Sequence, residues 1–554
     1  MRRQSTILIV VGLLVAVALA GLWWRATWVA NHLLHSEAPK SIADKSGGVY
    51  RLAVGRVRFN PFARRIKVDS IHLTTDEAAN ARRPQPRAVL RLALQSCTLR
   101  GIHLVKLVAG RGLTADSFGC PVATASADVS LAHGTAAGSG GAATVAAGQA
   151  FYVLQRGLRL PAFAPNIAVQ RIEFPNVELD LRLRPAGRGQ RTSRLRLGRL
   201  QWRMADFAVD PADSAATSRP LFSRTVEIAG EHFVWALDST PVIRVARFAA
   251  SLPDSTIEIH GIAFAPAVSI DRIALRGFDA GEFILGNGLR ARRVQVDSLH
   301  IDVLSDRRQP SKTLAKHHRN PQQWIADLDR SIAVESLLVR GGEVLYREHR
   351  PRRPNPGVMT FARLDAVAVH VRHLAGRRTG ARGGGDPMTL HATAYLQDSG
   401  RLDTRFVVPL DAPRFDMMFA GTLSTMPADK LNAFIEQTLA VRVDKGLINE
   451  ITFDASVVDG VARGTITPRY KDFALAVTGR GAKGILGTGG AVGDAARGVA
   501  TLVENETALR SDNPDEGQTT PRRGTINHAF NPAETLPGFL WFSLRDGLFA
   551  VVRK

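Results

Sequence analysis

Residues 332–339 read IAVESLLV, with apolar residues at the first, third, sixth and eighth places and a polar pair at the centre. The same pattern occurs in IKVDSIHL from Ile66, IAVQRIEF from Ile167, LRLGRLQW from Leu195, VSIDRIAL from Val268 and VQVDSLHI from Val294. Places one and three alternate with polar residues, which is the period of a half-buried β-strand. Places six and eight alternate on the opposite parity, so a β-bulge or tight bend at the centre must turn the chain over. Repetition of one bent strand predicts a long, repetitive β-sheet rather than a compact enzyme core.

The composition allows either several domains or one extended repeat body. The chain has 554 residues, of which 45% are hydrophobic, and a formal net charge of +22. This charge attracts anionic lipid headgroups or other polyanions, or it reflects an arginine-rich background composition. Only 6% of residues are aromatic, and the basic residues are not interleaved with them. Because single-stranded nucleic acids bind by stacking on aromatic rings, no nucleic-acid partner is predicted.

The N-terminal sequence predicts a membrane anchor. Residues 7–24, ILIVVGLLVAVALAGLWW, carry no charge and are long enough to cross a bilayer as a helix. Two arginines at residues 2 and 3 place residues 1–6 in the cytoplasm, and tryptophans close the span at the membrane interface. The residues that define the anchor are Ile7, Leu14, Trp23 and Trp24. A cleaved signal peptide is the alternative, because residues 18–20 read ALA; the apolar run continues past that point, which favours the uncleaved helix.

The rest of the chain divides into strand-rich segments and polar or glycine-rich stretches. The predicted β segments are residues 49–120, 160–304 and 332–477. The stretches without periodicity, predicted to be a disordered insertion and a disordered linker, are residues 121–148 and 478–523. The predicted helices are residues 428–439 and an apolar C-terminal helix at residues 536–552. The predicted fold is therefore mainly β: an N-terminal transmembrane helix, then an elongated, curved, groove-like repeat sheet with a few short helices.

The C-terminal helix has two interpretations. Leu540, Leu544 and Leu548, with Phe549 one place on, fall along one stripe at helical spacing, and residues 545 and 546 lie off it. In one interpretation the helix caps the open end of the sheet. In the other it lies in a membrane interface, with Trp541 at the headgroup level and the terminal basic residues on anionic lipid.

The cysteines and histidines predict no metal centre. Cys97 and Cys120 are the only cysteines, and they either form one disulfide in an oxidising compartment or stay unpaired. The adjacent His317 and His318, and the pair His370 and His373, lack a carboxylate or cysteine at metal-ligand spacing. No catalytic or phosphate-binding motif is present either. The sequence thus predicts no catalytic residue, no metal and no cofactor.

A set of strand and turn motifs in the C-terminal half resembles AsmA-like proteins. Residues 419–423 read FAGTL, a strand ending in a G-x-L turn, and a short helix carries NAF at 432–434. The strand VDKGLI follows at 443–448, and a returning strand begins with GVA at 460–462. With the predicted anchor and the repeated bent strands, these motifs resemble that family.

The resemblance implies a single-pass protein of the cell inner membrane, with most of the chain in the periplasm. AsmA-like proteins are linked to outer-membrane biogenesis and to the movement of phospholipid along an apolar groove. The implied partners are therefore phospholipid or another envelope lipid and the inner membrane. This chain is shorter than the larger members, so a groove that spans the whole envelope is not implied. The apolar places next to the central polar pairs are the lipid-groove candidates: Val68, Ile71, Val169, Ile172, Ile270, Ile273, Val296, Leu299, Val334 and Leu337.

Two alternatives remain for these positions and for the function. The same ten side chains suit the ordinary core of a β-sandwich. A structural or assembly scaffold, which binds another envelope protein through a sheet edge, is the alternative to lipid binding.

Overall fold

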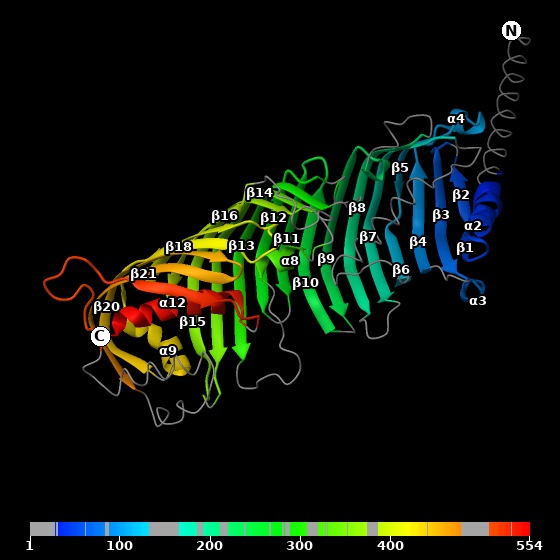
Figure 1. Ribbon diagram of the computed structural model, residues 1–554. Helices are drawn as coiled ribbons and strands as arrows, with labels where there is room; N and C mark the ends of the chain where they lie inside the picture. Colours follow the sequence, from blue (N-terminus) through cyan, green and yellow to red (C-terminus); the bar gives the residue numbers. More distant parts are fainter. Residues whose placement is uncertain are drawn as a thin grey trace, which may run out of the picture. The chain divides into compact units, whose positions relative to one another are not determined.

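The computed structural model of the protein describes most of the strand-rich segments (Figure 1). The described residues are 28, 31–60, 62–83, 88–131, 165–185, 192–210, 220–237, 240–264, 267–279, 282, 288–306, 320–326, 328, 331–351, 353–373, 386–439, 441–477, 509–532 and 534–553. They are mainly β with a few short helices, as the repeats predict. The chain forms two compact units, the first containing β1 to β11 and the second containing β12 to β22.

Unit 1 is a mixed β-sheet with short helices at its margins. Its strands are β1 (Tyr50–Val54), β2 (Val57–Asn60), β3 (Arg65–Thr75), β4 (Val89–Arg100), β5 (Leu113–Gly119), β6 (Val122–Leu131), β7 (Ile167–Pro185), β8 (Ser193–Val209), β9 (Thr225–Leu237), β10 (Thr240–Ser251) and β11 (Thr256–Phe264). Its helices are η1 (Leu33–Glu37), α2 (Ala38–Ser46), α3 (Glu77–Ala81), α4 (Leu104–Val108) and η2 (Pro220–Phe222). Both β1 and β2 pair with β3, and β3 pairs with β4. The sheet is parallel where β5 and β6 meet β7, and it continues antiparallel from β7 to β11.

Unit 2 is also a mixed sheet, and two of its helices pack on one face. Its strands are β12 (Val268–Arg276), β13 (Gly288–Asp306), β14 (Ser331–His349), β15 (Gly357–His373), β16 (Met388–Leu396), β17 (Gly400–Val408), β18 (Met417–Leu423), β19 (Met426–Pro427), β20 (Val441–Val458), β21 (Val461–Val477) and β22 (Gly524–Ala529). Its helices are α8 (Pro321–Ala326), η3 (Ala428–Leu431), α9 (Asn432–Leu439) and α12 (Leu536–Val552). Only β13 and β14 pair in parallel; the other described pairings in this unit are antiparallel.

The central polar pair of each repeat interrupts the ladder, as the change of parity predicts. Between β7 and β8, Val169 pairs with Phe207 and Arg171 pairs with Ala205, while Gln170 and Asp206 stay unpaired across the ladder. Asp206 has a φ of 52°, in the left-handed region. The other interrupted pairs, each with its second residue in the left-handed region, are Asp69–Ser96, Asp271–Ser298 and Glu335–His370.

The interruption changes which residues face the apolar side. In β7, Ile167, Val169, Ile172 and Phe174 are buried or half-buried, whereas the intervening residues 170, 171 and 173 are exposed. In this repeat the two successive polar residues 170 and 171 thus face water, and the apolar residues on both sides stay on one face. The residue pairs before and after each break keep one register, so the chain turns over at these repeats by the predicted tight bend and not by a two-against-one β-bulge.

The prediction of a disordered insertion at residues 121–148 is wrong for its first part. Residues 122–131 form β6, which pairs antiparallel with β4 and in parallel with β7. Small residues such as Ala123 and Ala125 give the sequence little hydrophobic alternation, so the strand was not predicted. The strand forms because its backbone groups are hydrogen-bonded to a neighbouring strand on each side. Residues 132–148 lie outside the described part of the chain.

The predicted disordered linker at residues 478–523 is also wrong for its last part. Residues 509–523 include a segment that lies beside β21. There, Tyr470 and Asn513 exchange backbone hydrogen bonds of 3.1 and 3.0 Å. Asn513 is buried, and its side chain accepts from Arg522 N–H at 2.8 Å and donates to Pro468 O. Polar contacts rather than an apolar pattern order this segment, so its composition gave no signal. Residues 478–508 lie outside the described part.

The predicted helices of the C-terminal half are present. Residues 428–439 begin as η3 and continue as α9, and α12 covers residues 536–552. The side chain of Asn432, from the NAF motif, joins α9 to β20: it donates to Val443 O and accepts from Val443 N–H, both at 2.8 Å. Within the described residues, none of the helices combines the length and apolarity that crossing a membrane requires. The predicted anchor at residues 7–24, with Ile7, Leu14, Trp23 and Trp24, lies outside them.

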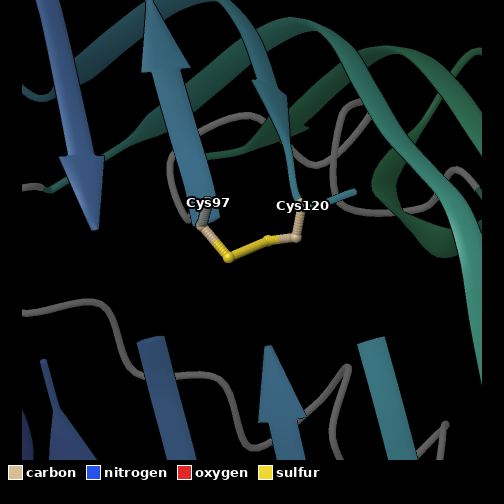
Figure 2. Close-up of a disulfide and its surroundings, with 2 residues drawn as sticks. All are labelled: Cys97 and Cys120. Atoms are coloured by element: carbon tan, nitrogen blue, oxygen red, sulfur yellow. A yellow bond between two sulfur atoms is a disulfide. The ribbon is translucent and has the colours of Figure 1, made fainter. Parts of the chain in front are cut away.

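The two cysteines form a disulfide that joins β4 to the end of β5 (Figure 2). Cys97 and Cys120 are both buried, and they lie in a cluster with Ile66, Val68 and Ile102. Of the two alternatives for the cysteines, the structure therefore has the disulfide.

Candidate functional site

The candidate residues of unit 1 share one face of its sheet. Val169 pairs with Phe207 of β8 on one side and with Ala115 of β5 on the other. Ile172 pairs with Met204 and with Phe118 in the same way. Directly paired residues project to the same side, so these side chains form continuous apolar rows.

The first two candidates belong to a closed core. Val68 pairs with Cys97, Ile71 pairs with Leu94, and all four lie in or against the cluster around the disulfide. At this end of unit 1, the ordinary core interpretation applies.

The candidates of unit 2 are brought together by β12, β13 and β14. Ile270 pairs with Leu299, and Ile273 pairs with Val296. In the parallel ladder, Leu337 pairs with Val294 and Val334 pairs with Ala291. All six candidates in this unit are buried or half-buried, and none belongs to the three clusters of buried residues that the described part contains.

Further apolar rows lie on β8 to β11 and were not among the candidates. Each row crosses β9, β10 and β11 by direct pairing. The rows are Trp235–Ile243–Phe264, Phe233–Val245–Ile262, Gly230–Phe248–Ile259 and Ile228–Ala250–Ile257. Leu195 and Trp202 of β8 extend the first and last rows. We call this surface the β8–β11 apolar face.

The opposite face of the same strands is polar. Arg244 and Arg247 of β10 are exposed and alternate with the apolar residues, and Arg247 pairs with Glu231 of β9. The sheet is therefore amphipathic across its thickness, with charge confined to one side.

Within the described residues, no element builds a core over the β8–β11 apolar face. None of its side chains belongs to the three clusters of buried residues, and most of them are half-buried rather than buried. Gly230 keeps the face compact: the ring of Phe248 lies over it, so a Cβ there would lie 2.5 Å from that ring. The face is thus a broad apolar surface without a second layer from the described part of the chain.

Two indole groups on this face have no hydrogen-bond acceptor among the residues that the structure describes. The Nε1 atoms of Trp202 and Trp235 are shielded from solvent, and neither donates to an acceptor among the described residues. A shielded indole N–H without an acceptor is unfavourable, so an oxygen supplied by a ligand would stabilise both side chains.

In unit 2, helices α9 and α12 cover part of the sheet. Phe434 of α9 and Phe539 of α12 are fully buried in clusters made largely of strand residues, and Phe542 of α12 is almost fully buried beside His528 of β22. Leu540, Leu544 and Leu548, the stripe identified in the sequence, also pack against these clusters. The capping interpretation of the C-terminal helix therefore holds, and its apolar residues are not free for a membrane interface.

The polar face of unit 1 contains a hollow of about 550 Å³, lined by His72, Arg91, Glu178 and His232 among others. Nearby, Arg194 donates to Asp180 from Nε at 2.8 Å, and this hydrogen bond holds the pKa of the Asp180 carboxyl below its usual range. In the described part of the chain, neither histidine bonds to a carboxylate that would orient its ring. Nor do the described residues include a group of three or more His, Cys, Asp or Glu arranged for a metal ion.

The sequence contained one signal for the β8–β11 apolar face. LRLGRLQW places Trp202 at its eighth place, and Arg199 in its centre takes the left-handed φ of a bulge, 50°. The residues of β9 to β11 depart from the eight-residue pattern, because Gly230 and Ala250 occupy apolar places. Only the strand register shows that they complete the rows.

No protein-family model matches this chain, and no curated protein is significantly similar to it.

Proposed function

We propose that the β8–β11 apolar face binds the acyl chains of phospholipid or another envelope lipid, in a protein anchored in the inner membrane. The observation that carries this proposal is a set of continuous apolar rows, opposite a charged face, without a covering core in the described residues. We propose binding or transfer rather than catalysis.

Acyl chains suit this surface because they need apolar area and no directional bonds. Burial of apolar surface contributes about 25 cal/mol per Å², or about 0.8 kcal/mol for each methylene group. The two unpaired indole N–H groups suit the ester or phosphate oxygens at the polar end of a lipid.

Two further features support a place in the cell envelope. The Cys97–Cys120 disulfide is typical of proteins that fold in an oxidising compartment such as the periplasm. The apolar segment at residues 7–24 supplies the proposed anchor, and the strand and turn motifs support the proposed kinship with AsmA-like proteins.

Lipid co-purification tests the proposal. The full chain is extracted in detergent, and its bound lipid is measured by mass spectrometry and phosphorus analysis. The expected result is phospholipid in stoichiometric amount, reduced in a Phe233→Gln, Phe248→Gln variant and unchanged in the matched polar-face variant Arg244→Gln, Arg247→Gln. A wild-type chain that carries no lipid above the detergent background contradicts lipid binding, and the assembly-scaffold alternative would then be preferred.

A further inference from the structure

We infer that one end of unit 1 is a second, independent contact site, which docks on an anionic phospholipid surface. It consists of the turn between β2 and β3, with Phe62 at its tip, and of α4, with Val105 on its outer side. We call this surface the β2–α4 tip. It is separate from the β8–β11 apolar face and does not depend on lipid binding there.

The two apolar side chains at this tip are the most exposed large hydrophobic residues in the described part of the chain. Phe62 is 90% exposed and Val105 is 82% exposed. Single exposed apolar residues are common on protein surfaces, but these two belong to segments that a backbone hydrogen bond joins.

A backbone hydrogen bond brings the two segments together. Ile102, just before α4, donates from its N–H to the carbonyl oxygen of Arg64 at 3.1 Å. Figure 1 shows α4 at the end of the strands where β2 turns into β3, and α3 at the other end. Because β3 has eleven residues, these ends are separated by about 33 Å.

The outward direction of Val105 is fixed by the packing of α4. Leu104 and Leu107 pack against the cluster around the disulfide, and Ile102 is fully buried beside them. Val105 and Lys106 consequently face solvent. The β2–α4 tip is therefore held in place by the apolar cluster that contains the disulfide.

The charged side chains within the two segments of the tip are all basic. Residues 60–67 contain Arg64, Arg65 and Lys67, residues 100–111 contain Arg100, Lys106 and Arg111, and neither segment contains Asp or Glu. Asp116 is the acidic neighbour, at 3.9 Å from Arg64. Exposed apolar side chains surrounded by basic side chains match the surface of a bilayer with anionic headgroups. The apolar side chains enter the membrane interface, and the basic side chains pair with the lipid phosphates.

Site-directed fluorescence tests this docking in the full chain, which has no free cysteine in its described residues. An environment-sensitive fluorophore is attached to Phe62→Cys or Val105→Cys, and the protein is incorporated into nanodiscs that contain phosphatidylglycerol. The control is Ala78→Cys in α3, which is exposed at the opposite end of the strands. Spin-labelled lipid in the disc should quench the probes at 62 and 105 and leave the probe at 78 unquenched.

Charge dependence is the second arm. Replacing phosphatidylglycerol by phosphatidylcholine, raising the salt concentration, or introducing Lys106→Glu with Arg111→Glu should each weaken the quenching at 62 and 105. Equal exposure to water at 62, 105 and 78 in anionic discs would overturn the inference. Protection of 62 and 105 in cells but not in discs would assign the tip to a protein partner and would also overturn it. A chain that fails to enter the discs would contradict the proposed anchor instead, and quenching by added anionic vesicles would then measure the tip alone.

Discussion

Asp271 of β12 and Ser298 of β13 lie opposite each other at a break in the ladder, and Ser298 has a φ of 54°. Ile270 and Leu299 pair on one side of this break, and Arg272 and Asp297 pair on the other. The left-handed residue turns the strand over, so that apolar residues on both sides of the break reach the same face. The same relationship recurs in both units and explains the eight-residue pattern.

Substitution at Ser298 tests this bend in the strand. A side chain in the left-handed region is strained by about 1–2 kcal/mol, so Ser298→Gly should raise the free energy of unfolding by up to about 1 kcal/mol. Ser298→Val should lower it by more than about 1 kcal/mol, because a β-branched residue fits this region worst. The matched control is the exposed Ser269 of β12, where Gly should instead destabilise by about 0.5–1 kcal/mol. Chemical denaturation measures all three, and the same sign for both glycine variants would contradict the account.

The capping of the sheet by α12 depends on a close approach between two glycines. A Cβ on Gly524 of β22 would lie 1.9 Å from the carbonyl oxygen of Gly547 in α12. Gly524→Ala must therefore displace the helix, and we expect a loss of about 1–3 kcal/mol together with increased binding of an apolar dye. Thr525→Ala, at the neighbouring exposed position, should change stability by less than about 0.5 kcal/mol. An unchanged melting temperature in Gly524→Ala would show that α12 does not pack as described.

The parts of the fold that could be predicted depend on residues close together in the sequence, and the parts that could not depend on pairing between distant segments. Alternation within a strand and the reversal at its centre are local, so the faces of Val169 and Ile270 followed from the sequence. The strand at 122–131 did not, because it depends on β4 and β7, which are distant in sequence. The candidate site shows the same difference. Trp202 could be placed from the sequence because it belongs to an eight-residue repeat, whereas Gly230 and Phe248 join the apolar rows only through the register of β9 and β10.

Removal of the disulfide should destabilise the end of unit 1 that carries α4. The bond between Cys97 and Cys120 closes a loop with a sequence separation of 23, and its loss frees that loop in the unfolded chain. A double Cys97→Ala, Cys120→Ala variant should lose about 3 kcal/mol. Denaturation with and without reductant provides the control, since only the wild type should respond to reduction. A wild type that is insensitive to reduction would contradict this role.

The buried phenol of Tyr470 gives stability a dependence on alkaline pH. Burial raises the pKa of Tyr470 from 10.0 to about 12, so the folded chain keeps a proton that the unfolded chain loses. The contribution of the protonated Tyr470 to the free energy of unfolding is fully present below pH 10 and is lost as the pH rises towards 12. Tyr470→Phe should reduce this fall.

At neutral pH the same variant should be tolerated. The Tyr470 hydroxyl has no partner among the described residues, so its removal should change stability by less than about 1 kcal/mol. Tyr50→Phe provides the contrast, because that hydroxyl donates to Ala88 O at 2.9 Å and its loss should cost about 1 kcal/mol. An alkaline unfolding curve that is identical in Tyr470→Phe and wild type would refute the assignment.

Photo-crosslinking in cells tests the central claim most directly. A photoreactive amino acid replaces Phe233 or Phe248 on the β8–β11 apolar face, or the exposed Glu231 or Arg247 on the opposite face of the same strands. Radiolabelled phospholipid should crosslink to the chain at 233 and 248 and not at 231 and 247. Crosslinking that is absent at all four positions, or equal on the two faces, would contradict lipid binding by this surface.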